Sequence, residues 1–147
     1  MSVSLRAAMQ SDLPAILEID GAAFSQPWSE KSFQDALDDK ARTVSLVAQS
    51  DDGTVCGFGF AWHVGEEGEI ATLAVADSEC GKGLGETIVR ALLKELHARG
   101  ATQIFLEVRP SNLAAQRLYE KIGFVQIGLR KNYYANGESA IVMKIAL

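Results

Sequence analysis

A carboxylate in the middle of an apolar segment is the residue of this sequence with the clearest chemical potential. Glu107 lies within residues 104–108, and the alternation of a strand places it on the face opposite Leu106. A carboxylate inside a sheet costs free energy unless it is paired or lines a cleft. Glu107 is therefore either ion-paired, for example with Arg109 or Lys131, or a general base that is reached from a cleft.

A tyrosine follows one helix later. Tyr119 comes four residues after Ala115 and three residues before Ile122, which places it on the apolar stripe of a helix. Taken alone, this position predicts a core tyrosine whose hydroxyl finds a partner.

A glycine-rich turn, residues 81–85, separates an apolar strand from a helix. The first N–H groups of a helix are unpaired and favour an anion, and glycine lets a ligand approach the backbone closely. The turn is therefore either a phosphate cradle or a plain connection between strand and helix. It is no dinucleotide fingerprint, because Glu86 stands three residues after Gly83, and no Walker A loop, because Gly83 follows Lys82.

These residues lie on segments that alternate between strand and helix. Residues 70–108 predict a β-α-β unit, in which a helix from Leu84 ends at Gly100 and connects two parallel strands by a right-handed crossover. A second helix, capped by Ser111 and ended by Gly123, follows this unit.

Antiparallel strands flank this parallel centre. Ser11 and Ser29 predict the caps of two earlier helices. The further predicted strands cover residues 3–7, 43–49, 55–64, 124–133 and 138–145. The predicted class is α/β, with a mixed central sheet and flanking helices, in one domain spanning residues 1–147.

Composition narrows the possible functions. The chain has 147 residues and a net charge of −5, so it has the size of one domain and lacks the basic surface of a nucleic-acid-binding protein. No apolar run approaches the ~18 residues of a membrane span, and the start lacks the layout of a signal peptide. Cys56 and Cys80 have no zinc-ligand spacing. We therefore expect a cytoplasmic protein that binds no metal, no membrane and no nucleic acid.

Several motifs follow one another in order along nearly the whole chain: Ile70-Ala71-Thr72-Leu73-Ala74-Val75, Gly83-Leu84-Gly85, Leu106-Glu107-Val108-Arg109, Ser111-Asn112, Ala115, Leu118-Tyr119-Glu120 and Gly123-Phe124. Together they resemble the GNAT superfamily of acetyl-CoA-dependent N-acetyltransferases. Two further segments are similar to the RimI-type branch, the ribosomal-protein-alanine N-acetyltransferases: Pro27-Trp28-Ser29 with Phe33, and Arg130-Lys131-Asn132-Tyr133-Tyr134.

The resemblance implies a role for each matching residue. Main-chain groups of Leu73, Ala74 and Val75 would bind the pantetheine arm, Asn112 would contact the coenzyme, and Glu107 and Tyr119 would be general base and general acid. The pyrophosphate would lie on the loop formed by Gly81, Lys82, Gly83, Leu84, Gly85 and Glu86. Cys80 stands where the superfamily usually has Gln or Arg, and Lys82 supplies a positive charge nearby.

The resemblance also implies the reaction and its partners. Acetyl-CoA would be the cosubstrate, without a metal, and the acceptor would be the N-terminal α-amine of a protein, expected to be a ribosomal protein. Trp28, Tyr133 and Tyr134 would surround that acceptor. Two alternatives stay open: an acetyltransferase of the same superfamily acting on a small amine or a lysine side chain, and a module that holds acetyl-CoA without turnover.

Overall fold

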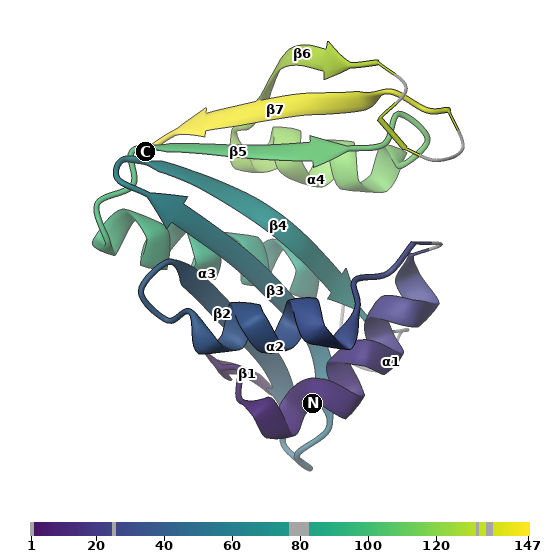
Figure 1. The fold of residues 1–147 in the computed structure, drawn as a ribbon, viewed down its shortest axis with the longest axis vertical. Helices are drawn as coiled ribbons and strands as arrows, with labels where there is room; N and C mark the ends of the chain where they lie inside the picture. The colour runs from purple at the N-terminus through teal and green to yellow at the C-terminus, as the bar shows by residue number, and fades with distance from the viewer. Residues whose placement is uncertain (1, 25, 77–82, 132, 135–136) are drawn as a thin grey trace.

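A mixed seven-stranded sheet forms the centre of the computed structural model, which describes residues 2–24, 26–76, 83–131, 133–134 and 137–147. The strand order is β1-β2-β3-β4-β5-β7-β6, and β4 and β5 form its parallel pair (Figure 1). The strands are β1 (Val3–Ala7), β2 (Thr43–Ser50), β3 (Val55–Val64), β4 (Glu67–Val75), β5 (Gln103–Val108), β6 (Val125–Arg130) and β7 (Ala140–Ala146). The predicted α/β class with a parallel β-α-β centre is confirmed.

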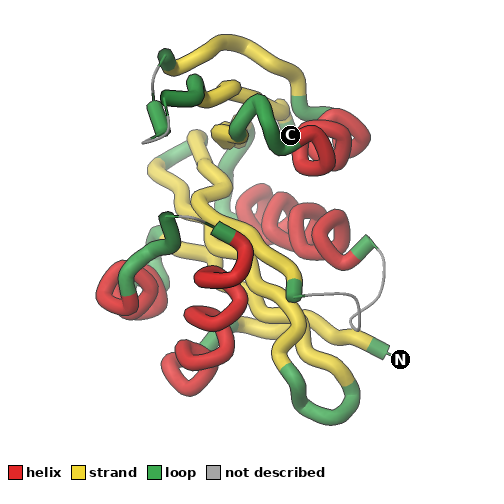
Figure 2. Tube along the Cα trace, turned by 90° about the vertical axis from the view of Figure 1, so that its right-hand side faces the viewer, coloured by secondary structure: helices red, strands yellow, loops and turns green. Residues whose placement is uncertain are grey.

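Helices cover both faces of the sheet. Figure 2 shows α1 (Leu13–Ala23) and α2 (Glu30–Asp38) on one side, and α3 (Leu84–Ala98) and α4 (Leu113–Ile122) on the other. Each face has its own apolar core: Phe33 of α2 packs with Phe58 and Phe60 of β3 on one face, while Ile88 and Leu92 of α3 belong to the core on the other. In the described part of the chain, no helix is long and apolar enough to cross a membrane.

Glycines in β3 let α3 lie directly on the sheet. A Cβ atom at Gly59 would come within 2.6 Å of Ile88 Cγ2 and 2.9 Å of Leu92 Cδ1, and one at Gly57 would come within 3.2 Å of Ile88 Cδ1. Side chains at these two positions would push the helix off the sheet. The close approach fixes α3, and with it the start of the helix, relative to β4.

The two parallel strands separate after a short paired stretch. Residues 67–69 of β4 pair with residues 103–105 of β5, and from residue 70 onward β4 pairs only with β3 among the described residues. In the β3–β4 pair, Phe60 is opposite Thr72 and Ala61 is opposite Ile70. Ala71 therefore has no opposite residue and forms a β-bulge in β4. A bulge bends its strand and increases its twist. Figure 1 shows β4 and β5 diverging toward their carboxyl ends.

Several predicted element boundaries need correction. Ser29 does cap α2, since its Oγ accepts from Ser32 N at 3.1 Å, but α4 is capped by Asn112 Oδ1, which accepts from Ala115 N at 3.1 Å, and not by Ser111. A short 3-10 helix (Gln10–Asp12) precedes α1, so Ser11 is no cap. The last two predicted strands are also too long: β6 spans only Val125–Arg130, and β7 does not start until Ala140.

Candidate active site

A cavity of about 770 Å³ opens where β4 and β5 separate. Residues 69–73 of β4 and 106–108 of β5 line it, together with Arg109 just after β5, residues of α4 and the segment after α1. Its volume lies within the range of pockets that take small molecules or cofactors. The cavity therefore exists because the sheet splits at this point. It exposes one edge of β4, where the backbone groups from residue 70 onward pair with no other described strand.

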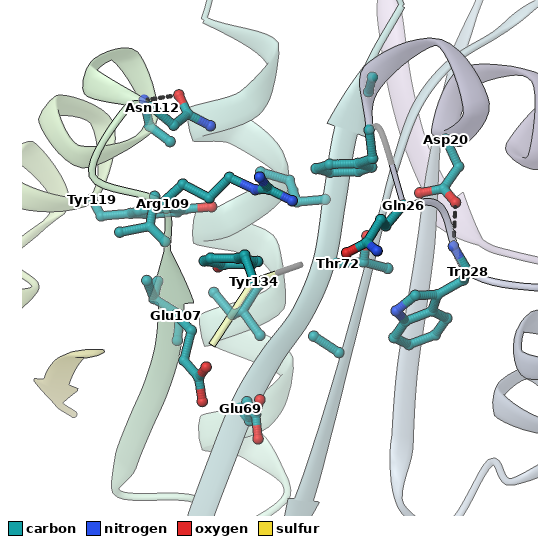
Figure 3. A pocket seen from close by; sticks show the side chains of 18 of the residues that line it. Asp20, Gln26, Trp28, Glu69, Thr72, Glu107, Arg109, Asn112, Tyr119 and Tyr134 are labelled. Carbon is teal, nitrogen blue, oxygen red and sulfur yellow. Dashed lines mark hydrogen bonds between the residues drawn. The ribbon is translucent and has the colours of Figure 1, made fainter. Parts of the chain in front are cut away.

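Glu107 lies on the β5 side of this cavity (Figure 3). Its Oε1 accepts a hydrogen bond from Arg130 Nη1 at 2.7 Å, while Oε2 is buried and has no hydrogen-bond partner among the described residues. The predicted ion pair exists, but with neither Arg109 nor Lys131. Register explains the choice: Glu107 is opposite Val142 of β7, and Arg130 is opposite Ala140, two residues away on the same face.

Tyr119 reaches the cavity from α4 and is 8% exposed. Its ring packs edge-on against Phe124, with centroids 5.7 Å apart. Burial, with a smaller contribution from Tyr134, raises the pKa of Tyr119 to about 12. The phenol therefore keeps its proton at neutral pH and can donate a hydrogen bond into the cavity.

Two arginine–tyrosine contacts form another wall. The Arg109 guanidinium lies 4.1 Å from the ring centroid of Tyr134, and that of Arg130 lies 4.3 Å from the centroid of Tyr133. The two tyrosine rings meet edge to face at 5.0 Å. Burial is the main cause that raises the pKa of Tyr134. Both hydroxyl-bearing rings are thus held at the cavity by stacked cations.

A buried carboxylate positions the opposite wall. Asp20 is 1% exposed, and its Oδ2 accepts from Trp28 N at 2.9 Å, which ties the segment after α1 to the helix. Burial raises the pKa of Asp20. The Trp28 ring stacks on Trp62 of β3, with centroids 5.8 Å apart and an interplanar angle of 14°. Trp28 is thus both part of the core and part of the cavity lining.

The predicted coenzyme residues divide between two places. Leu73 and Asn112 line the cavity, whereas Ala74 and Val75 continue β4 beyond it. Gly83, Leu84, Gly85 and Glu86 form the start of α3, while Gly81 and Lys82, with Cys80, lie outside the described residues.

The start of α3 has the features of an anion cradle. Gly83 has φ +83°, which disfavours any side chain, and a Cβ there would meet nothing within 4 Å. The N–H groups of residues 84–86 precede the first helical bond, from Thr87 N to Gly83 O at 3.1 Å. The Glu86 carboxylate is turned to Lys121 (2.8 Å) and Arg90 (2.9 Å), and these contacts lower its pKa.

Sequence reasoning predicted seven of the residues that line this cavity as site residues, but it missed Glu69 and Asp20. Seven predicted residues line the cavity: Trp28, Leu73, Glu107, Asn112, Tyr119, Tyr133 and Tyr134. Glu69 also lines it, but in the sequence it only precedes the apolar segment that begins at Ile70. The available signal was a second acidic residue on a strand parallel to that of Glu107. No group of three metal-ligating side chains occurs in the described part of the chain.

Comparisons with known proteins fit this geometry. The model of the Acetyltransferase (GNAT) family matches residues 13–124. Curated relatives from Salmonella typhimurium and Escherichia coli (strain K12), both named ribosomal protein bS18-alanine N-acetyltransferase, are 36% and 34% identical over 140 residues, 93% of this chain and 93% of each relative. A crystal structure of the ribosomal-protein-S18-alanine N-acetyltransferase from Escherichia coli has a TM-score of 0.88 at 33% identity, covering 99% of this chain and 94% of the other.

Proposed function

The chain belongs to the acetyltransferase (GNAT) family, and from this premise we propose that it acetylates the N-terminal α-amine of a ribosomal protein. As a member of that family it uses acetyl-CoA as cosubstrate. The observation that carries the proposal is the cavity between β4 and β5, which Glu107 and Tyr119 both line. We propose that residues 1–147 act as one acetyltransferase domain, and a ribosomal-protein acceptor would put the reaction in the cytoplasm.

The proposed base is Glu107. A free α-amine has a pKa of ~7.7–8.0, so near neutral pH most of it is protonated and cannot attack a thioester. Glu107 Oε1 is held by Arg130 at 2.7 Å, which fixes the carboxylate, while Oε2 is left without a partner among the described residues. A buried oxygen that lacks a donor is suited to accept the proton of the incoming amine, directly or through a water molecule.

The coenzyme would lie along the free edge of β4. When bound, acetyl-CoA supplies an activated acyl group as a thioester. Among the described residues, no strand pairs with Leu73, Ala74 and Val75 on the side of β5, so their backbone groups can bind the pantetheine arm. Asn112 can contact the coenzyme from the start of α4. The backbone of residues 81–86 would hold the pyrophosphate, and the open, positive-φ geometry at Gly83 supports this placement.

Tyr119 would serve the leaving group. With a pKa of about 12, its phenol is protonated throughout the neutral range. A thiol has a pKa near 8.5, so complete proton transfer from this phenol to a thiolate is unfavourable by itself. Tyr119 therefore first stabilises the departing thiolate by donating a hydrogen bond to the sulfur. The thiolate is then protonated through the phenol, which takes a replacement proton from solvent.

The acceptor would enter from the face of α1 and α2. Trp28, Tyr133 and Tyr134 line the cavity there and can contact an extended amino-terminal peptide. The relatives named for alanine acetylation of bS18 support a peptide acceptor of this kind.

A competition between acceptors tests the proposal. The protein is incubated with acetyl-CoA and three amines in equal amount: an Ala-starting peptide, the same peptide with a blocked amino terminus and an internal lysine, and a polyamine. We expect acetylation of the first alone at early time points, with the acetyl group located on the α-amine by tandem mass spectrometry. Faster acetylation of the lysine or the polyamine would overturn the proposed acceptor.

A further inference from the structure

A second carboxylate lies on the face of the sheet that bears Glu107. Glu69 of β4 is level with Phe105 of β5 in the parallel pair, and Glu107 is two residues further along β5. Residues at one level of neighbouring strands, and residues two apart on one strand, project on the same side. Glu69 and Glu107 therefore share the face that α1 and α2 cover, and Figure 3 shows both carboxylates at the cavity.

The two carboxylates differ in what surrounds them. Glu107 is paired with Arg130, and the other arginine of this wall, Arg109, is 3.9 Å from Glu138. In the part of the chain that the structure describes, no salt bridge reaches Glu69. Burial is the largest cause and raises its pKa, and nearby Glu107 also raises it, while a hydrogen bond from Trp62 and the charge of Arg130 lower it. Glu69 is thus a half-buried carboxylate with no salt bridge of its own among the described residues, since Arg130 is hydrogen-bonded to Glu107.

Aromatic rings lie beside this charge. Trp62 is directly opposite Glu69 in the β3–β4 pair, so it projects on the same face, and its ring stacks on Trp28. Trp62 keeps 36% of its surface exposed. Because the indole N–H of Trp62 donates to Glu69, the carboxylate lies at the edge of the ring, and one face of the ring is stacked on Trp28. A guanidinium suits this arrangement, since it can pair with the acid and contact the neighbouring indole.

We propose that Glu69, with Trp62 beside it, binds a basic side chain of the acceptor at the residue after the acetylated amino terminus. This inference rests on the proposed function, because it needs a peptide whose α-amine lies at Glu107. Glu69 is two residues from the level of Glu107, which is about 7 Å along parallel strands. The long side chain of arginine or lysine spans that separation, while the α-amine stays at the thioester.

Three peptides that differ only at the second residue, Ala-Arg, Ala-Gln and Ala-Glu, test the inference by their kcat/KM values. We expect the protein to prefer Ala-Arg over Ala-Gln by about tenfold, the ratio that ~1.4 kcal/mol of charge-assisted hydrogen bonding gives. Glu69→Gln should reduce this ratio to below about twofold, and Glu69→Lys should favour Ala-Glu instead. Glu120→Gln is the matched control, since it removes one exposed carboxylate on α4 and should leave the ratio unchanged.

Binding gives a readout that does not depend on turnover. Trp28 and Trp62 are the two tryptophans of the chain, so intrinsic fluorescence reports on this wall. In the presence of coenzyme A, titration with the Ala-Arg peptide should change the emission, and Glu69→Gln should raise the Kd by about tenfold, as expected for a lost charge-assisted contact.

Three results would overturn the inference, and they are distinguishable from one another. Equal kcat/KM for Ala-Arg and Ala-Gln would refute it while leaving N-terminal acetylation intact. A Glu69→Gln variant that slows all three peptides equally and shifts the pH–rate profile would assign Glu69 to proton transfer instead of recognition. If the unaltered protein acetylated none of the peptides, the proposed function itself would fail.

Discussion

Replacing Tyr119 by phenylalanine separates the packing of the ring from the proton of the hydroxyl. The ring contact with Phe124, at 5.7 Å between centroids, should persist in Tyr119→Phe. Because only the hydroxyl is removed, we expect acetyl-CoA binding to change little and kcat to fall by roughly 10²–10⁴-fold, as for the loss of a general acid. The same substitution also removes a buried ionisable group, so it should change how the free energy of unfolding depends on pH.

The sign and size follow from the shifted pKa. Burial raises the pKa of Tyr119 from 10.0 to about 12, so the folded state favours the protonated phenol. This contribution to stability is fully present below pH 10 and is lost as the pH rises toward 12. Two pKa units correspond to about 3 kcal/mol in total, of which about 1.4 kcal/mol should be lost by pH 11. Tyr119→Phe has no such loss, so the difference in unfolding free energy between the two proteins should change by that amount.

Denaturant unfolding of both proteins at pH 9, 10 and 11 measures this difference, since ionisations common to both proteins cancel. Absorbance of tyrosinate at ~295 nm, compared between the two proteins, gives the titration of Tyr119 directly among the three tyrosines. A difference in unfolding free energy that stayed constant from pH 9 to 11, with the missing tyrosine titrating near pH 10, would refute the burial argument. In that case Tyr119 would reach solvent.

Three further substitutions test other parts of the site. Gly83→Asp should weaken acetyl-CoA binding several-fold or more in calorimetric titration. Gly53→Asp, at another positive-φ glycine with open space, should not weaken it. Equal affinity of the two variants would show that the start of α3 does not bind the coenzyme phosphates. Gly59→Ala should lower the unfolding free energy by about 1–3 kcal/mol, because the added Cβ overpacks against Ile88. Gly128→Ala, where a Cβ would meet nothing within 4 Å, should lower it by less. An unchanged melting temperature for Gly59→Ala would show that α3 can move. Tyr134→Ala should raise KM for a basic Ala-starting peptide and leave KM for acetyl-CoA unchanged, because the ring stacked on Arg109 lines the side of the cavity proposed for the acceptor. A parallel rise in both KM values would indicate packing instead.

Local patterns predicted the elements of this fold well, because each depends on neighbouring residues. Alternation placed Glu107 on the face opposite Leu106, and Leu106 is indeed buried. The glycines after α3 and α4 end those helices as expected, with φ +100° at Gly100 and +124° at Gly123. Adjacent candidates were harder to separate: Asn112 caps α4 in place of Ser111, since either side chain could have accepted from the first turn.

Contacts between distant strands could not be predicted from the sequence. The partner of Glu107 is Arg130, because β7 lies between β5 and β6 and its register carries Arg130 to the correct face. The split between β4 and β5, and the grouping of Trp62 with Glu69, likewise depend on register. A single sequence does not specify which residues of two strands lie opposite each other, so the grouping of Glu69 with Trp62 could be seen only in the structure.

The central claim is that Glu107 takes the proton of the acceptor amine in the cleft between β4 and β5, and the pH dependence of Glu107→Gln tests it most directly. With an Ala-starting peptide and acetyl-CoA, kcat should fall by roughly 10²–10⁴-fold near pH 6.5, where the amine is protonated, and by less near pH 9, where the free amine is already abundant. Glu120→Gln should keep the profile of the unaltered protein. A Glu107→Gln variant that is folded by circular dichroism and has an unchanged pH–rate profile would contradict the account.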